Sequence, residues 1–78
     1  MSAPTTAVDP ASQPRQVWAA RLGYLKSRGH ADDHPDVVTC REALAYYRIS
    51  KSVAAETGHL SGPGADRLVA QLRQAVAR

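Results

Sequence analysis

Apolar residues recur in three stretches of the chain with the spacing of α-helices, and no stretch shows a sustained strand-like alternation. In residues 15–28, one helical face is formed at the spacing i, i+4, i+7 by Trp18, Leu22 and Leu25. Residues 61–77 begin with Ser61, a favourable N-cap residue. They contain an apolar stripe at the spacing i, i+3, i+4, i+7, i+11, formed by Ala65, Leu68, Val69, Leu72 and Val76. Both stretches predict amphipathic helices.

The middle stretch, residues 35–57, predicts a helix with two apolar arcs instead of one. Pro35 and the neighbouring aspartates suit a helix N-terminus, and Gly58 suits a helix end. At about 100° per residue, one arc holds Val37, Cys40, Leu44 and Tyr47, and the other holds Val38, Ala45, Ile49 and Val53. A helix with two apolar faces needs two neighbours. These are the other two helices, or one of them and a second chain.

The expected fold is therefore all-α, with three helices. We expect residues 35–57 and 61–77 to pack as an antiparallel hairpin, and the helix at 15–28 to pack on it. Residues 1–14 contain three prolines and little apolar bulk, which predicts a disordered tail before a single small domain at 15–78. Fourteen of the apolar residues are alanines, so the core is small. A core of this size rarely supplies more than about 3–5 kcal/mol of stability.

Charge and cysteine content restrict the classes of function that the sequence favours. The net charge is +3, with four basic residues clustered in the first predicted helix: Arg15, Arg21, Lys26 and Arg28. This cluster is weaker than the dense basic stripe that indicates nucleic-acid binding by itself. The single cysteine excludes an internal disulfide and suits a reducing cytoplasm. The sequence shows neither a membrane-spanning apolar run nor a secretory signal, so we expect a cytoplasmic protein that does not engage a membrane.

Candidate chemistry is sparse. His30, His34 and Cys40 are ligand types that Zn²⁺ accepts. However, Gly29 and Pro35 predict a break that separates the two histidines, and Cys40 lies on an apolar arc, where a free cysteine usually behaves as a small buried hydrophobe. The sequence also lacks a phosphate-binding loop, a zincin motif and a nucleophile elbow. We therefore expect no catalytic residue, metal, cofactor or small-molecule substrate.

Nucleic-acid binding is the alternative function. Ala54 and Gly58 have the spacing of the small residue and turn glycine in a helix-turn-helix. The rest of that pattern fails, because polar residues or glycine occupy the positions that should be apolar: Thr57, His59, Gly64 and Arg67. Under this alternative, phosphates would be contacted by the basic residues of the first helix.

Protein–protein interaction is the favoured function. Aromatic and arginine side chains often dominate the energetics of interfaces, and the candidates here are Trp18, Tyr24, Tyr46, Tyr47, Arg41 and Arg48. The small core and the doubled apolar arcs predict a non-catalytic helical adaptor or regulator. It would bind a protein partner or form a homo-oligomer. The alternative is a small DNA-binding regulator of a phage or mobile element.

Residues 31–76 also contain a helix start with two aspartates and a proline (Asp-Asp-His-Pro), a long Arg/Ala-rich helix, and a Leu-Ser cap that leads to Asp-Arg-Leu and Leu-Arg. The residues that form this pattern are Asp32, Asp33, Pro35, Arg41, Leu60, Ser61, Asp66, Arg67, Leu68, Leu72 and Arg73. The pattern resembles short actinobacterial open reading frames of prophage-like elements. Where those have Pro-Glu-Gln after the cap, this chain has Gly62-Pro63-Gly64. The resemblance implies a mobile-element context and no particular activity.

Overall fold

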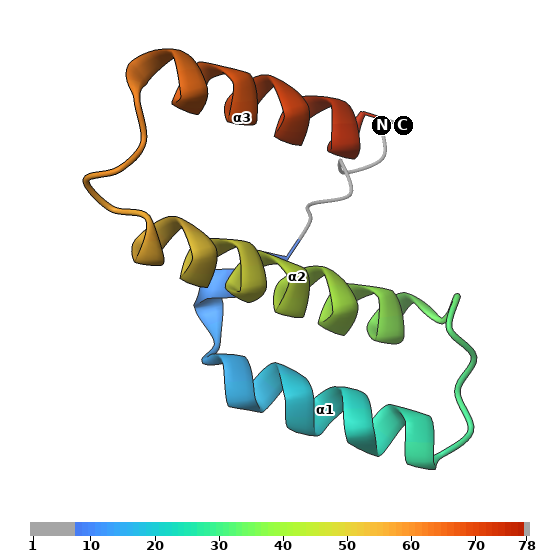
Figure 1. The fold of residues 1–78 in the computed structure, drawn as a ribbon. Helices are drawn as coiled ribbons and strands as arrows, with labels where there is room; N and C mark the ends of the chain where they lie inside the picture. The colour runs from blue at the N-terminus through green and yellow to red at the C-terminus, as the bar shows by residue number, and fades with distance from the viewer. Residues whose placement is uncertain (1–7, 78) are drawn as a thin grey trace.

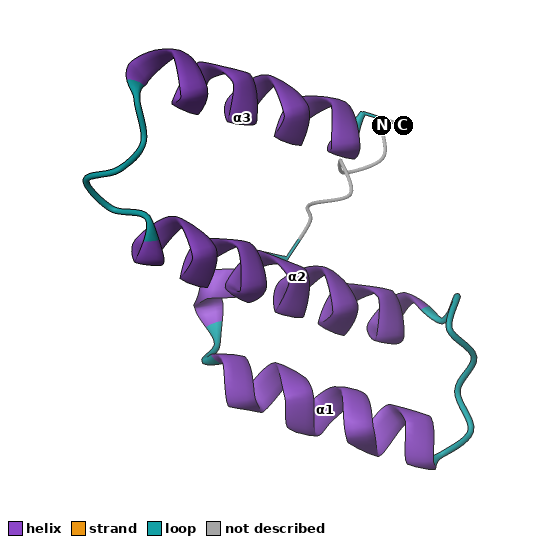
Figure 2. Ribbon diagram, in the orientation of Figure 1, coloured by secondary structure: helices purple, strands orange, loops and turns teal. Residues whose placement is uncertain are grey.

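The computed structural model describes residues 8–77, and every regular element in that range is helical. A short 3₁₀ helix, η1, spans Pro10–Ser12, and the α-helices are α1 (Arg15–Ser27), α2 (Pro35–Ala55) and α3 (Gly62–Val76) (Figures 1 and 2). The predicted all-α fold with three helices is confirmed. The predicted helix bounds differ from the observed ones by no more than two residues.

Local side-chain and backbone chemistry sets these bounds. The His34 ring caps α2 by accepting the Asp36 backbone N–H through Nδ1, and the Ser61 hydroxyl caps α3 by accepting the Gly64 N–H. After α1 and α2, the chain turns at Gly29 and Gly58, whose φ values are +84° and +86°. Side chains with a Cβ rarely adopt this left-handed conformation, so glycine favours the turn at both positions.

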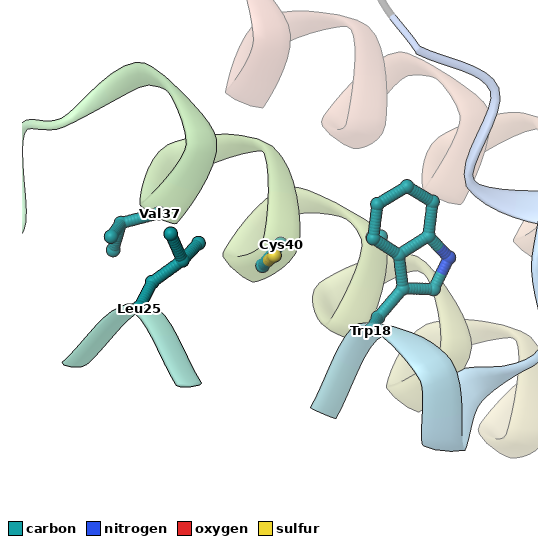
Figure 3. Close-up of a cluster of buried hydrophobic side chains, with 5 residues drawn as sticks. Trp18, Leu25, Val37 and Cys40 are labelled. Carbon is teal, nitrogen blue, oxygen red and sulfur yellow. The ribbon is translucent and has the colours of Figure 1, made fainter. Parts of the chain in front are cut away.

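The core lies between α1 and α2, which pack side by side as a helical hairpin (Figure 1). Trp18 and Leu25 from α1 meet Val37 and Cys40 from α2 in this core (Figure 3), together with Ala43. Leu22, Leu44 and Tyr47 pack around its edge. The predicted stripe of the first helix and the first arc of the middle helix therefore form one seam, and the prediction that the first helix packs on the middle one is confirmed.

The segment before α1 is more structured than its composition predicted. Residues 1–7 of the predicted disordered tail lie outside the described residues. Within the rest, η1 packs against α2, and its Pro10 carbonyl accepts the Trp18 indole N–H at 2.9 Å. The Tyr47 hydroxyl also donates to the Gln13 carbonyl at 2.6 Å. These two bonds attach the segment to the core at Pro10 and Gln13, contacts that its composition did not predict.

The prediction that α2 and α3 pack closely is wrong within this chain. The turn at Gly58 sends α3 back antiparallel to α2, as expected (Figure 1). Among the described residues, however, α3 makes no close backbone contact with α1 or α2, and none of its residues is buried. α1 and η1 cover the first arc of α2. The turn and cap at Gly58 and Ser61 fix the direction of α3 but not its distance from α2, so the second arc and the α3 stripe line a shared groove and stay about half exposed.

Candidate interaction surface

The apolar stripe of α3 is largely exposed to solvent. Leu68, Val69 and Leu72 are 43%, 51% and 44% exposed, and Val76 is 85% exposed. Burying a Val or Leu side chain is worth about 1.5–3 kcal/mol relative to leaving it exposed. Four such residues left exposed on one helix face therefore forgo much of the stabilisation that a small chain can gain from burial.

The second apolar arc of α2, together with Leu60 in the following loop, extends this exposed surface. Ile49, Val53 and Leu60 are each about half exposed. We call the combined patch the outer surface; its members are Ile49, Val53, Leu60, Leu68, Val69, Leu72 and Val76. Val38, on the same arc nearer the start of α2, is also exposed. Contiguous exposed apolar patches of this kind mark interaction sites on soluble proteins.

A groove runs between the end of α2 and the start of α3. It has a volume of about 320 Å³, and its lining comprises Arg48, Ile49, Ser52, Val53, Glu56, Leu60 and Leu68. A second hollow of about 400 Å³ lies along the far half of α3, next to Val69, Leu72 and Val76. The groove has an apolar floor with Arg48 and Glu56 among its lining residues, which suits an apolar side chain from another helix better than a polar small molecule.

Two of the predicted partner-binding residues are used inside the chain. Trp18 is only 1% exposed, and its indole N–H is already donated to Pro10. Tyr47 packs at the edge of the same core and holds Gln13. Both therefore stabilise the hairpin.

The other predicted partner-binding residues lie outside the core but do not form one surface. Tyr24 is exposed on α1, with the Arg28 guanidinium 5.8 Å from its ring centroid. Tyr46 is partly exposed and packs edge-on against Tyr47, with ring centroids 5.0 Å apart. Of the predicted residues, only Arg48 lines the groove.

Arg41 belongs to a small ion cluster at the turn between α1 and α2. One carboxylate oxygen of Asp32 accepts from Lys26 Nζ at 2.7 Å and from Arg41 at 3.4 Å. The hydrogen bond and the charge of Lys26, followed by the charge of Arg41, lower the pKa of Asp32 below its ordinary value. This cluster links α1 to α2 across the turn, so Arg41 has a local structural contact of its own.

The four basic residues of the first predicted helix, three in α1 and Arg28 at its C-cap, do not form one stripe. Residues seven or eleven apart share a side of a helix, so Arg15 aligns with Lys26 and Arg21 aligns with Arg28. The two pairs lie on opposite flanks of the Trp18–Leu25 seam. Lys26 is paired with Asp32, and the Arg21 guanidinium lies 5.1 Å from the Trp18 ring centroid. The basic charge is thus divided between two flanks and partly engaged.

The candidate metal and nucleophile residues also have local structural contacts. His34 caps α2, and the His30 ring lies against it with centroids 4.4 Å apart. Cys40 is completely buried in the seam, where desolvation raises the pKa of its thiol. A thiol with a raised pKa is a poor nucleophile at neutral pH. Within residues 8–77, no three potential ligands gather in a geometry that suits a metal ion.

Sequence reasoning found the residues of the outer surface but assigned them a different role. The stripe at Leu68, Val69, Leu72 and Val76 was expected to pack on the middle helix. The sequence pattern held no signal against that packing, since Gly62-Pro63-Gly64 affects the start of α3, which the Ser61 cap secures, and not its neighbour. The apolar pattern identifies which side chains favour burial, but it does not identify the surface that buries them.

Comparisons of the chain with protein-family models, with curated proteins and with solved structures found no match. The resemblance to open reading frames of prophage-like elements therefore stays a prediction. In the part of the chain that the structure describes, no helix combines the length and the apolar character that crossing a bilayer requires.

Proposed function

We propose that the protein is a non-catalytic helical adaptor or regulator that acts by binding a protein chain, another protein or its own copy, through the outer surface. One observation supports this most strongly: α3 has a complete amphipathic stripe, yet none of its residues is buried within the chain. The hairpin of α1 and α2 would serve as the scaffold that presents this surface.

The stability of an isolated helix strengthens the argument. Helices shorter than about 12–15 residues are marginal in water even with good helix formers, and α3 has 15 residues with two glycines in its first turn. Most helical stability in proteins comes from packing of the apolar face. Because the described chain supplies little packing for α3, a second chain is the natural source of it.

The chemistry of the described residues supports a non-catalytic role. The one thiol is buried with a raised pKa, and His34 is engaged as a helix cap. The lone thiol also supports our proposal of a cytoplasmic location, since secreted domains of this size usually rely on disulfides. Regulation within a prophage-like element remains the context proposed from the sequence resemblance.

Photo-crosslinking in living cells tests the proposed function. A photoreactive amino acid at Val69, in the stripe, is compared with one at Gln74, on the opposite side of α3. We expect a discrete crosslinked product from position 69 that is lost when Leu72→Asp is added, and none from position 74. Mass spectrometry of the product then identifies the partner or a second copy. Equal labelling from both positions, or a product that Leu72→Asp leaves unchanged, would contradict the proposal.

Nucleic-acid binding ranks second, because the basic residues of α1 are divided between two flanks. A salt titration distinguishes the two functions. Phosphate-driven affinity falls steeply as salt rises, whereas contacts between apolar helix faces respond little. We expect no binding to duplex DNA at low salt; salt-sensitive binding that Arg15→Gln and Arg21→Gln abolish would favour the alternative.

A further inference from the structure

We infer that the occupant of the outer surface is a second copy of this chain, with the two α3 helices paired antiparallel about a two-fold axis. This inference rests on the proposed function and specifies its partner. It comes from the order of residues along α3, where the apolar stripe and the flanking charges agree on a single antiparallel register.

The apolar residues define the register first. In an antiparallel pair, each residue of one helix lies beside a residue of the other, and the sum of the two residue numbers stays constant. One register places Val69 beside Leu72 of the second copy and Ala65 beside Val76 of the second copy. By the two-fold symmetry the reverse contacts form as well. All four residues lie on the stripe, so this register buries it on both chains.

The flanking charges independently favour the same register. Asp66 and Arg73 are seven residues apart and therefore lie on one flank of the stripe. In an antiparallel helix pair, like flanks face each other. The register sets Asp66 of each copy two positions from Arg73 of the other, an axial offset of about 3 Å that the long arginine side chain spans. In a parallel pair this flank would face the opposite one, which has Gln71. Neither Asp66 nor Arg73 has an ion pair among the described residues of the single chain.

The groove provides room for the end of the incoming helix. Val76 is the most exposed large apolar residue among residues 8–77, and the register places Val76 of the second copy over Ala65, at the start of α3. The groove formed with Ile49, Val53 and Leu68 adjoins this position. A stable interface buries about 800 Å² on each partner, more than one short stripe offers. The second arc of α2 supplies the additional area.

A charge-reversal experiment on the full chain tests the pairing, with sedimentation velocity as the readout and Trp18 fluorescence as the check that the α1–α2 hairpin stays folded. We expect the wild-type chain to dimerise as its concentration rises. D66R and R73D should each weaken dimerisation about tenfold or more, because each variant turns both symmetry-related attractions into repulsions. R67D is the matched control, since it makes the same charge change as R73D on the far side of α3.

Mixing the variants gives the decisive measurement. An equimolar mixture of D66R and R73D should form heterodimers more tightly than either variant forms homodimers, because every flanking pair then joins opposite charges. Each substitution also weakens its own helix end, but that effect persists in the mixture and cannot produce this recovery. A mixture no tighter than the separate variants overturns the inference, as does equal weakening by R67D.

The outcomes also separate this inference from the proposed function. A wild-type chain that stays monomeric at every concentration, together with a position-69 crosslink to a different protein, overturns self-pairing and leaves the proposed function standing. A monomer with no crosslink at position 69 overturns both.

Discussion

At the scale of single residues, Trp18 is the largest fully buried side chain among the described residues. It is the only tryptophan, it is fully buried between α1 and α2, and its indole N–H holds the Pro10 carbonyl. The sequence predicted that Trp18 lies on the apolar face of its helix. It did not predict the bond to Pro10, because a backbone carbonyl acceptor leaves no mark in the composition of a segment.

We predict that Trp18→Ala unfolds the chain at room temperature, whereas Trp18→Phe does not. Replacing a buried tryptophan by alanine costs about 3–5 kcal/mol, which equals the whole stability expected of so small a core. Phenylalanine keeps most of the packing and loses the indole hydrogen bond, a cost of about 1 kcal/mol. Urea unfolding followed by far-UV circular dichroism measures both. A cooperative transition of Trp18→Ala at the wild-type midpoint would show that the core lies elsewhere.

Asp32 gives a prediction with a defined pH dependence. Its folded-state pKa is lowered, chiefly by Lys26, so the carboxylate stabilises the fold above its unfolded pKa. That stabilisation is lost as the pH falls through the lower folded pKa. Asp32→Asn should therefore lower the thermal midpoint at neutral pH, and the difference should shrink below about pH 4. Asp33→Asn is the control, because no ion pair involves Asp33 in the described residues. A difference that stays constant down to pH 2 would refute this linkage.

At the scale of elements, local signals were sufficient for the helices and insufficient for their pairing. Ser61, Gly29 and Gly58 set helix ends through their own backbone and side-chain chemistry, so their roles could be predicted from the sequence. The two apolar arcs of α2 are similar in size and composition, and nothing local states which neighbour takes which arc. In the structure, α1 packs on the first arc, and the second arc, with Ile49 and Val53, stays exposed.

The dependence on tertiary packing also explains why the predicted partner contacts differ from the exposed outer surface. Aromatic residues were predicted as partner contacts because such residues often dominate interfaces. In a chain with four aromatics, however, the core needs them first, and Trp18 and Tyr47 pack there. The exposed outer surface is aliphatic. It was visible in the sequence as the α3 stripe, but its exposure depends on tertiary packing.

At the scale of the whole molecule, the chain divides into a packed unit, residues 9–47, and an outer surface on the rest of α2 and on α3. The packed unit contains every buried residue described. The division means that folding of the core and the proposed association through α3 are separable. Binding of a partner should therefore stabilise α3 far more than it stabilises the seam between α1 and α2.

Truncation of the chain after His59 tests this separation. Because α3 makes no close backbone contact with the hairpin and buries none of its residues, we predict that the shortened chain keeps the wild-type unfolding midpoint, measured by Trp18 fluorescence at a protein concentration too low for association. At high concentration the full-length chain should gain helicity and stability, because association would bury the apolar face of α3 and stabilise its helix. The truncated chain, which lacks α3, should show neither gain. Leu72→Asp in the full chain should behave like the truncation, which distinguishes loss of the apolar stripe from loss of chain length. A truncated chain that unfolds markedly earlier at low concentration would mean that α3 stabilises the hairpin directly, and the separation of core and surface would fail.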